Sequence, residues 1–323
     1  MSVKVVTSSR SAGEVSAMTG SAPWLAISSR TAPRRASAAK PSRASMASGA
    51  SPAAAKAARE REILARRGVQ EDPVRPAASD SAKRVAAASW SALAGALCRQ
   101  GRMEESLEAS RMVGTLEPLR KNESLFNLNY SSSLTPEEIS AAHFEAAEAR
   151  LGHFYREQFF ENSLDLNKRL RVGFVSGDLV SHPVSYFIDP ILEHLPKFCD
   201  VLIYHNRPTS EEDVVSDAMK SYNLTWRNIA ESSDEAAHKL ILEDQIDVLV
   251  DLSGHTAYHR LPLFAMRAAP VQVTCTGYPN TTGLRTMDYF LCHQTTCTDR
   301  LQKLFSEKMF PFSRTSFVYR PLI

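Results

Sequence analysis

Three short polar segments of the chain combine residue types that bind ligands or transfer protons. The first, residues 176–183 (SGDLVSHP), follows an apolar run and contains a carboxylate, Asp178, and an imidazole, His182. Backbone N–H groups exposed at the start of a helix donate hydrogen bonds to anionic groups. This segment therefore favours binding of an anionic or sugar-like ligand. The alternative is a structural cap formed by Asp178 beside a structural histidine.

The second segment, residues 253–260 (SGHTAYHR), contains two histidines at a spacing that is also found in metal sites. His255 and His259 are four residues apart, as in an H-E-x-x-H zinc site. The glutamate of that motif is missing, however, and His255 falls in a predicted loop. We therefore predict a polar loop that binds ligand hydroxyls, and no metal site.

The third segment, residues 276–283 (TGYPNTTG), is rich in turn-forming residues and hydroxyl groups. Glycine, proline and asparagine each favour turns for separate physical reasons. A simple connection between two elements does not need this many of them together. The composition therefore indicates a third ligand-binding loop.

From residue 169 onward, short apolar strands alternate with amphipathic helices. This alternation predicts an α/β fold, a Rossmann-like parallel sheet with helices on both faces, over residues 169–323. Ligands bind to such sheets at the carboxyl ends of the strands, and all three polar segments follow predicted strands. The predicted strands are 170–175, 201–204, 246–251, 270–275 and 289–291, and the predicted helices are 184–195, 211–222, 233–243 and 259–267.

Residues 85–168 are predicted to form a helical segment ahead of this lobe. Thr135, Pro136 and Glu138 form a capping box with proline at the first helical position, which starts a helix that runs to about Gly152. An ordinary helical hairpin is one interpretation of the preceding residues. The other is a tetratricopeptide repeat, whose spacing is present in Trp90, Leu93, Ala94, Leu97, Gly101 and Pro118.

Residues 1–84 have the composition of a tail. Residues 1–59 hold nine Lys or Arg and a single acid, Glu14, and about half of them are Ala or Ser. Such a stretch buries too little apolar surface to offset the entropy of ordering it. The composition is typical of a disordered extension and equally of an organelle-targeting segment.

The composition of the whole chain argues against several classes of protein. Its 38 Lys and Arg residues nearly balance its 36 Asp and Glu residues, unlike those of a strongly basic nucleic-acid binder. No run of 18 apolar residues occurs, which argues against a membrane span. Five cysteines, an odd count, favour reduced thiols, and Cys292 and Cys297 lack the second pair of a zinc site.

Two runs resemble the catalytic region of the O-linked N-acetylglucosamine transferase and SPINDLY family, glycosyltransferase family 41. They are RLRVGFVSGDLVSHPVSYFI at 169–188 and IDVLVDLSGHTAYHRLPLFAMRAAPVQVTCTGYPNTTGLRTMDY at 246–289. The resemblance implies an inverting, metal-independent, two-lobe glycosyltransferase without a cofactor. It implies transfer from UDP-N-acetylglucosamine or GDP-fucose to Ser or Thr of nuclear and cytoplasmic proteins, with no nucleic-acid or membrane partner.

The resemblance also assigns roles to individual residues by position. His182 and Asp178 match catalytic positions, where the histidine positions donor and substrate. The residues assigned to donor or substrate binding are Ser181, Pro183, His255, Thr256, Arg260, Tyr278, Pro279 and Asn280.

In the family, the cations that stabilise the departing diphosphate belong to a second lobe. The sequence stops where that lobe is expected to begin, so we expect a truncated chain that is inactive alone. The alternative function is a noncatalytic protein-binding module built from the repeat and one lobe.

Overall fold

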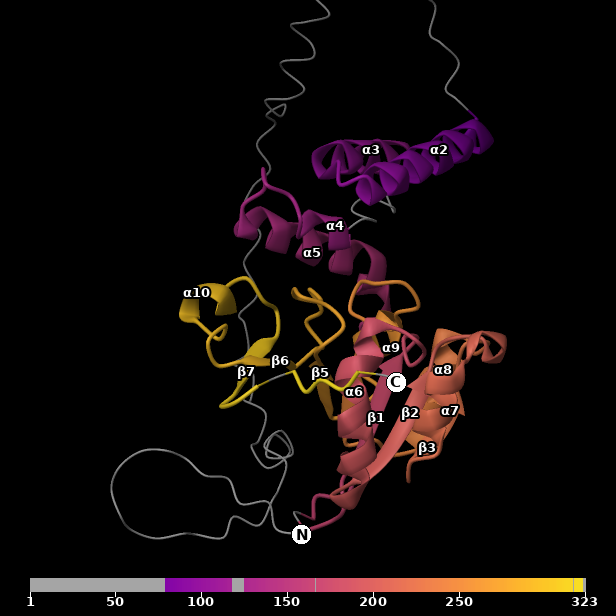
Figure 1. Cartoon of the computed structure of the whole chain (residues 1–323), viewed down its shortest axis with the longest axis vertical. Helices are drawn as coiled ribbons and strands as arrows, with labels where there is room; N and C mark the ends of the chain where they lie inside the picture. Colours follow the sequence, from indigo (N-terminus) through magenta and orange to yellow (C-terminus); the bar gives the residue numbers. More distant parts are fainter. Residues whose placement is uncertain (1–78, 118–124, 166, 316, 322–323) are drawn as a thin grey trace, which may run out of the picture. The chain divides into compact units, whose positions relative to one another are not determined.

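The computed structural model describes residues 79–117, 125–165, 167–315 and 317–321 (Figure 1). They belong to two compact units, which divide between His153 and Phe154. The tail predicted for residues 1–84 lies outside the described residues, except for residues 79–84. Pro118, the last position of the predicted repeat, also lies outside them.

The first unit is helical. The side chain of Ser79 accepts a hydrogen bond from the Ala82 N–H, so the first helix begins ahead of the predicted start at residue 85. The predicted helical hairpin is present, whereas its assignment as a tetratricopeptide repeat stays a prediction. The helices are α2 (Asp80–Arg99), α3 (Met103–Leu116), α4 (Leu125–Leu128), α5 (Pro136–Leu151) and the 3-10 turn η3 (Gly152–Phe154).

Small side chains let α2 and α3 pack closely. Ala94, Leu97 and Ala109 are buried together between the helices. Ser106 stands where the repeat pattern expects alanine, and its buried Oγ donates to the Ala94 carbonyl at 2.7 Å. Gly101, in the turn, has a φ of 74°, a conformation that glycine adopts without strain.

The predicted capping box at the start of α5 is confirmed. Thr135 Oγ1 accepts from the Glu138 N–H at 3.2 Å, and Glu138 Oε2 accepts from the Thr135 N–H at 2.8 Å. Pro136 occupies the first turn, where its missing N–H has no intrahelical partner to lose. The helix ends at Leu151, as the sequence predicts.

The second unit is a seven-stranded parallel sheet in the order β3-β2-β1-β4-β5-β6-β7, which confirms the predicted α/β class (Figure 1). Its strands are β1 (Arg171–Ser176), β2 (Asp200–His205), β3 (Thr225–Asn228), β4 (Val248–Asp251), β5 (Val271–Thr274), β6 (Tyr289–His293) and β7 (Lys308–Phe312). Its helices are α6 (Pro183–His194), α7 (Val214–Lys220), α8 (Asp234–Glu243), α9 (Leu261–Ala265) and α10 (Asp299–Gln302), with 3-10 turns η4 (Leu195–Lys197) and η5 (Thr209–Glu211).

The register of the sheet explains its apolar core. Phe174 is aligned with Ile203 on one side and with Val250 on the other, so their side chains share one face. They are buried in one cluster with Ile188 of α6 and Met219 of α7. Burial of large side chains on a continuous face is the main stabilising contribution to such a lobe.

In this unit the five predicted strands are confirmed, but the sequence missed two strands and one helix. The missed elements are β3, β7 and α10. β3 is a short polar edge strand, and β7 contains Pro311, which an edge strand tolerates because one side of its ladder stays unpaired.

Helix α9 is shorter than predicted. It ends at Ala265, and Arg267 adopts a left-handed φ of 60°, which terminates the helix.

Among the described residues, no helix has the length and apolarity to cross a membrane. All five cysteines lie in the described part of the chain and are free thiols.

Candidate active site

The three predicted loops follow β1, β4 and β5, which are adjacent in the sheet. Since parallel strands end at the same edge, the loops meet there, and glycines allow them to touch. A Cβ on Gly177 would overlap the Cβ of Tyr258, and a Cβ on Gly254 would overlap the ring of Tyr278. The structure therefore brings the three polar segments to one edge.

Asp178 lies in the β1 loop and is almost completely buried. Its Oδ1 is 4.0 Å from His182 Nε2 and 3.6 Å from Arg207 Nη2. Burial raises the pKa of Asp178 above its ordinary value, while the charges of His182 and Arg207 oppose that rise. Asp178 is thus a desolvated carboxyl group flanked by two cationic or potentially cationic side chains.

His182 is the N-cap residue of α6. Its Nδ1 accepts a hydrogen bond from the Val184 N–H at 3.3 Å, and its side chain is 41% exposed. An Nδ1 that accepts is unprotonated, so the neutral ring carries its proton on Nε2. The Nε2–H, on the side of Asp178, is therefore available to donate to a ligand oxygen.

Ser181 and Pro183 flank His182 and are exposed. The Ser181 N–H donates to Asp213 Oδ2 at 2.7 Å, and Asp213 also caps α7. This bond ties the β1 loop to the start of α7. Both predicted binding residues therefore lie beside His182 at the open side of the loop.

Asp251 ends β4, and sequence reasoning gave it no role in the site. It is fully buried and accepts from Thr274 Oγ1 at 2.7 Å, the Gly254 N–H at 2.9 Å and the Ser253 N–H at 3.2 Å. Burial raises the pKa of Asp251 to about 6, although these donors oppose the rise. Its hydrogen bonds fix the turn that leads to His255.

His255 and Thr256 lie in the turn that Asp251 holds. His255 Nε2 is 2.8 Å from the Thr282 carbonyl, to which it donates, and Thr256 Oγ1 donates to the Ser253 carbonyl at 2.8 Å. The His255 and His259 rings are 6.3 Å apart. Within the described residues, no three His, Cys, Asp or Glu side chains are grouped to hold a metal.

Arg260 is engaged by groups near the end of β3. Its Nη2 donates to the carbonyls of Ile229 and Ser232 at 3.0 and 2.7 Å, and its Nη1 lies 3.2 Å from Asp234. These contacts hold the β4 loop against the segment between β3 and α8. These contacts favour a structural role for Arg260. Its predicted role in ligand binding stays a prediction.

The β5 loop contains both buried and exposed residues. Tyr278 is buried, whereas Pro279 is exposed and Asn280 is half-buried. The buried Glu307, which sequence reasoning missed, accepts from Thr281 Oγ1 at 2.6 Å and from the Thr282 N–H at 2.7 Å. A carboxylate 25 residues downstream of Thr282 thus fixes the shape of the loop.

A fourth loop, after β2, also reaches this edge. Its Arg207 donates through Nε to the Gly177 carbonyl at 2.6 Å and lies beside Asp178. β2 is hydrogen-bonded to β1, so this loop neighbours the β1 loop. The position of this loop was predictable from the sequence, because the predicted strand 201–204 also ends at the carboxyl edge of the sheet.

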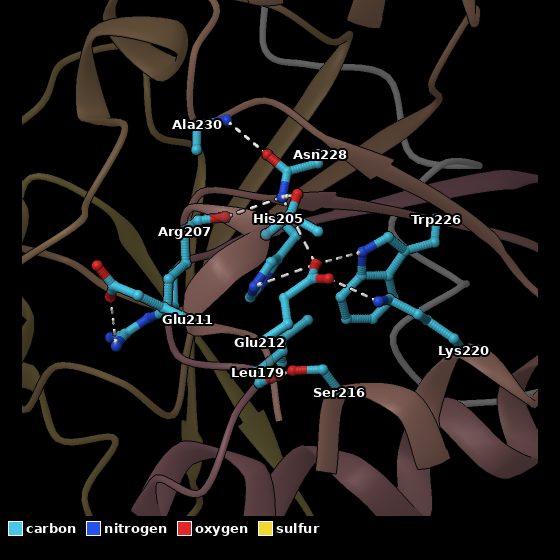
Figure 2. A network of polar contacts seen from close by, with 12 residues as sticks. Leu179, His205, Arg207, Glu211, Glu212, Ser216, Lys220, Trp226, Asn228 and Ala230 are labelled. Atoms are coloured by element: carbon cyan, nitrogen blue, oxygen red, sulfur yellow. Dashed lines mark hydrogen bonds and ion pairs between the residues drawn. The ribbon is translucent and has the colours of Figure 1, made fainter. Parts of the chain in front are cut away.

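A buried polar network anchors the β2 loop (Figure 2). His205 is fully buried at the end of β2, 3.8 Å from Glu212 Oε1. Burial lowers the pKa of His205 to about 4, so the ring is neutral at pH 7. Glu212 also accepts from Lys220 Nζ at 2.6 Å and from Trp226 Nε1 at 3.2 Å. The network joins β2, α7 and β3 behind the site.

The arrangement of the sheet and these loops agrees with comparisons with known proteins. The family model for Glycosyl transferase family 41 matches residues 129–320, more than half of the chain. The chain belongs to this family. The chain also matches a solved structure of a mutant Thermobaculum terrenum O-GlcNAc transferase. The TM-score is 0.67 at 32% identity, and the match covers 72% of this chain and 45% of the transferase chain.

Curated relatives show a similar level of identity. A probable UDP-N-acetylglucosamine–peptide N-acetylglucosaminyltransferase SPINDLY from Petunia hybrida is 34% identical over 168 residues, 51% of this chain and 18% of the relative. A UDP-N-acetylglucosamine–peptide N-acetylglucosaminyltransferase from Caenorhabditis elegans is 30% identical over 161 residues, 48% of this chain and 14% of the relative. The chain thus spans less than a fifth of the length of these relatives.

Proposed function

We propose that the protein is a glycosyltransferase that transfers a sugar from a nucleotide-sugar donor to Ser or Thr hydroxyls of proteins. The observation that carries the proposal is the Asp178–His182 pair at the carboxyl edge of a family 41 lobe. The names of its relatives support UDP-N-acetylglucosamine as donor. GDP-fucose is the second candidate, supported by the resemblance to the SPINDLY branch.

The chemistry of an inverting transfer matches the groups at this edge. The acceptor oxygen forms a bond to the anomeric carbon while the bond from that carbon to the diphosphate oxygen breaks, and the acceptor proton must leave. The Nε2–H of His182 suits it to orient a substrate oxygen rather than to remove a proton. The buried carboxylate of Asp178 is the better proton acceptor, because burial raises its pKa.

The described lobe supplies only part of the groups that this reaction needs. Charge develops on the departing diphosphate, and donors directed at such charge usually contribute most to catalysis. The resemblance implies that those donors belong to a second lobe. We therefore propose that turnover requires that lobe and that residues 169–321 hold the sugar and the acceptor.

The test is sugar transfer by the protein expressed from its complete open reading frame. A Ser/Thr peptide is incubated with UDP-N-acetylglucosamine or GDP-fucose, with and without EDTA, and the product is measured by mass spectrometry. We expect transfer from one donor, no effect of EDTA, and a loss of about 100-fold or more in His182→Ala. Absence of transfer from both donors contradicts the proposal, and peptide binding without transfer supports the protein-binding module instead.

A further inference from the structure

The loop after β2 contacts two of the candidate ligand loops at once. From this loop, Arg207 Nε donates to the Gly177 carbonyl at 2.6 Å, and its Nη2 lies 3.6 Å from Asp178 Oδ1. Asn206 Nδ2 donates to the Tyr258 carbonyl at 2.8 Å in the β4 loop. The β2 loop therefore bridges the β1 and β4 loops.

Tyr258 is the point at which the β4 loop is clamped. Its φ is 57°, in the left-handed region, where a bulky residue is strained. The Arg207 guanidinium lies over its ring, 4.3 Å from the centroid, and the missing side chain of Gly177 leaves room for its Cβ. Tyr258 OH also donates to Glu211 Oε2 at 3.4 Å. The surrounding side chains therefore offset the strain and fix the loop.

The backbone that carries Arg207 is itself fixed. Asn228 Nδ2 donates to the Arg207 carbonyl at 2.8 Å. His205, two residues before Arg207, is buried in the network with Glu212 (Figure 2). A long arginine side chain loses much rotamer entropy when it is held, so a fixed backbone and several partners favour one orientation. The guanidinium is thus pre-organised toward Asp178.

We propose that Arg207 is a positioning residue of the site, which keeps Asp178 a carboxylate beside His182 and holds the β4 loop through Tyr258. The inference rests on the proposed function for its catalytic meaning. Its geometric part rests on contacts of 2.6 to 4.3 Å among described residues alone.

The charges around Asp178 give the sign of the effect. His182 faces it from α6, Arg207 faces it from the β2 loop, and Glu211 and Asp213 lie beyond Arg207. Burial raises the pKa of Asp178, and the positive charge of Arg207 lowers it. Removal of that charge therefore raises the pKa of Asp178 and depletes its carboxylate form at a given acidic pH.

The experiment measures the ionisation of Asp178 directly in the 323-residue chain. Protein labelled with ¹³C at the aspartate carboxyl carbon is titrated by NMR, and the Asp178 signal is assigned by its loss in Asp178→Asn. In Arg207→Gln we expect the pKa of Asp178 to rise by about one unit, the usual size for loss of a nearby opposite charge. In Arg207→Lys, which keeps the charge, we expect a smaller rise.

Arg227→Gln is the matched control. Arg227 forms a bidentate pair with Asp244 in the same unit, so it also loses an arginine–carboxylate pair but leaves the Asp178 signal unchanged. An unchanged pKa of Asp178 in a folded Arg207→Gln protein overturns the inference. If Arg207→Gln does not fold, the uncharged Arg207→Met is titrated in its place, and an unchanged pKa of Asp178 there overturns the inference equally.

A second readout separates this inference from the proposed function. In the complete protein, Arg207→Gln is expected to move the acidic limb of the pH–rate profile to higher pH, which a merely structural loss of activity does not do. If Arg207→Gln shows the NMR shift but the native complete protein shows no transfer, the proposed function is contradicted and the Arg207–Asp178 coupling is supported. If the native protein transfers sugar but Arg207→Gln changes neither the acidic limb of the pH–rate profile nor the NMR titration of Asp178, the function is supported and the coupling is overturned.

Discussion

Asp178 and Asp251 are buried carboxyl groups at the ends of neighbouring strands, but their partners differ in kind. Asp251 accepts three hydrogen bonds from neutral donors, at 2.7 to 3.2 Å. Asp178 instead lies 3.6 Å from Arg207 and 4.0 Å from His182. The hydrogen bonds of Asp251 come from β5 and from the turn after β4. Asp178 instead lies among charged side chains, close to the half-exposed imidazole of His182.

The difference teaches which carboxyl group serves the fold and which serves chemistry. A group whose hydrogen bonds are all made within the protein holds a loop in shape. A buried carboxyl group with a raised pKa and ionisable neighbours has the properties of a catalytic acid or base. We therefore propose that Asp251 maintains the shape of the β4 loop and that Asp178 takes part in the reaction.

The largest expected effect comes from separating the β4 and β5 loops, which approach closely at Gly277. A Cβ on Gly277 would overlap the Leu252 carbonyl oxygen, so Gly277→Ala forces the β5 loop away from the β4 loop. We expect the free energy of unfolding to fall by about 4 kcal/mol, measured by urea denaturation. Gly101→Ala is the control, since its Cβ meets no atom within 4 Å and only the backbone conformation is strained. Equal losses in the two variants contradict the predicted close approach of the loops.

The ionisation of Asp251 gives a pH-dependent effect on stability. Its folded pKa of about 6 exceeds the ordinary value of 3.8, so its contribution is full below about pH 4 and is lost as pH rises through 6. Between pH 4 and 7 we expect the native chain to lose about 2 kcal/mol of unfolding free energy relative to Asp251→Asn. Urea denaturation of both proteins across this range measures it. If the unfolding free energies of the two proteins change with pH in parallel, the raised pKa of Asp251 is contradicted.

A variant of Arg260 tests whether this residue fixes the β4 loop to the segment between β3 and α8 or binds a ligand. Arg260→Ala removes two hydrogen bonds to carbonyls and a pair with Asp234. We expect a loss of about 2 kcal/mol in the free energy of unfolding, with KM for the donor unchanged in the complete protein. A raised KM with unchanged stability shows instead that Arg260 binds the donor.

The smallest expected effect separates two roles of His182. Its Nδ1 caps α6, so His182→Ala is expected to lose about 1 kcal/mol of unfolding free energy. His182→Asn retains a capping oxygen and restores that stability, measured by thermal denaturation. Transfer is expected to stay low in both variants. Recovery of transfer in His182→Asn shows that the cap alone matters.

The sequence predicted the elements whose apolar pattern is strong and missed those whose place depends on neighbours. The runs that became β1 and β4 are buried on both faces and are recognisable from composition. β3 reads TWRN, a polar segment that becomes a strand because it pairs with β2 at the edge of the sheet. Such edge pairing is a tertiary effect that local propensity does not encode.

The candidate site was predictable in its loops but not in its partners. The rule that ligands lie at the carboxyl ends of strands located Asp178, His182 and His255 correctly at one edge. Glu307 and Arg207 come from segments that carry no motif, and they reach the loops only through the strand order. The sequence also gave no sign that Asp251 is satisfied by neutral donors.

The central claim is tested most directly by matched Asp178→Asn and Asp251→Asn variants of the complete protein, assayed for sugar transfer and for the free energy of unfolding. For Asp178→Asn we expect transfer to fall by about 100-fold or more, with stability at pH 7 equal to or above that of the native protein. For Asp251→Asn we expect transfer within about tenfold of the native rate. Near-native transfer by Asp178→Asn, or a larger loss of transfer in Asp251→Asn, contradicts the division of roles between the two carboxyl groups.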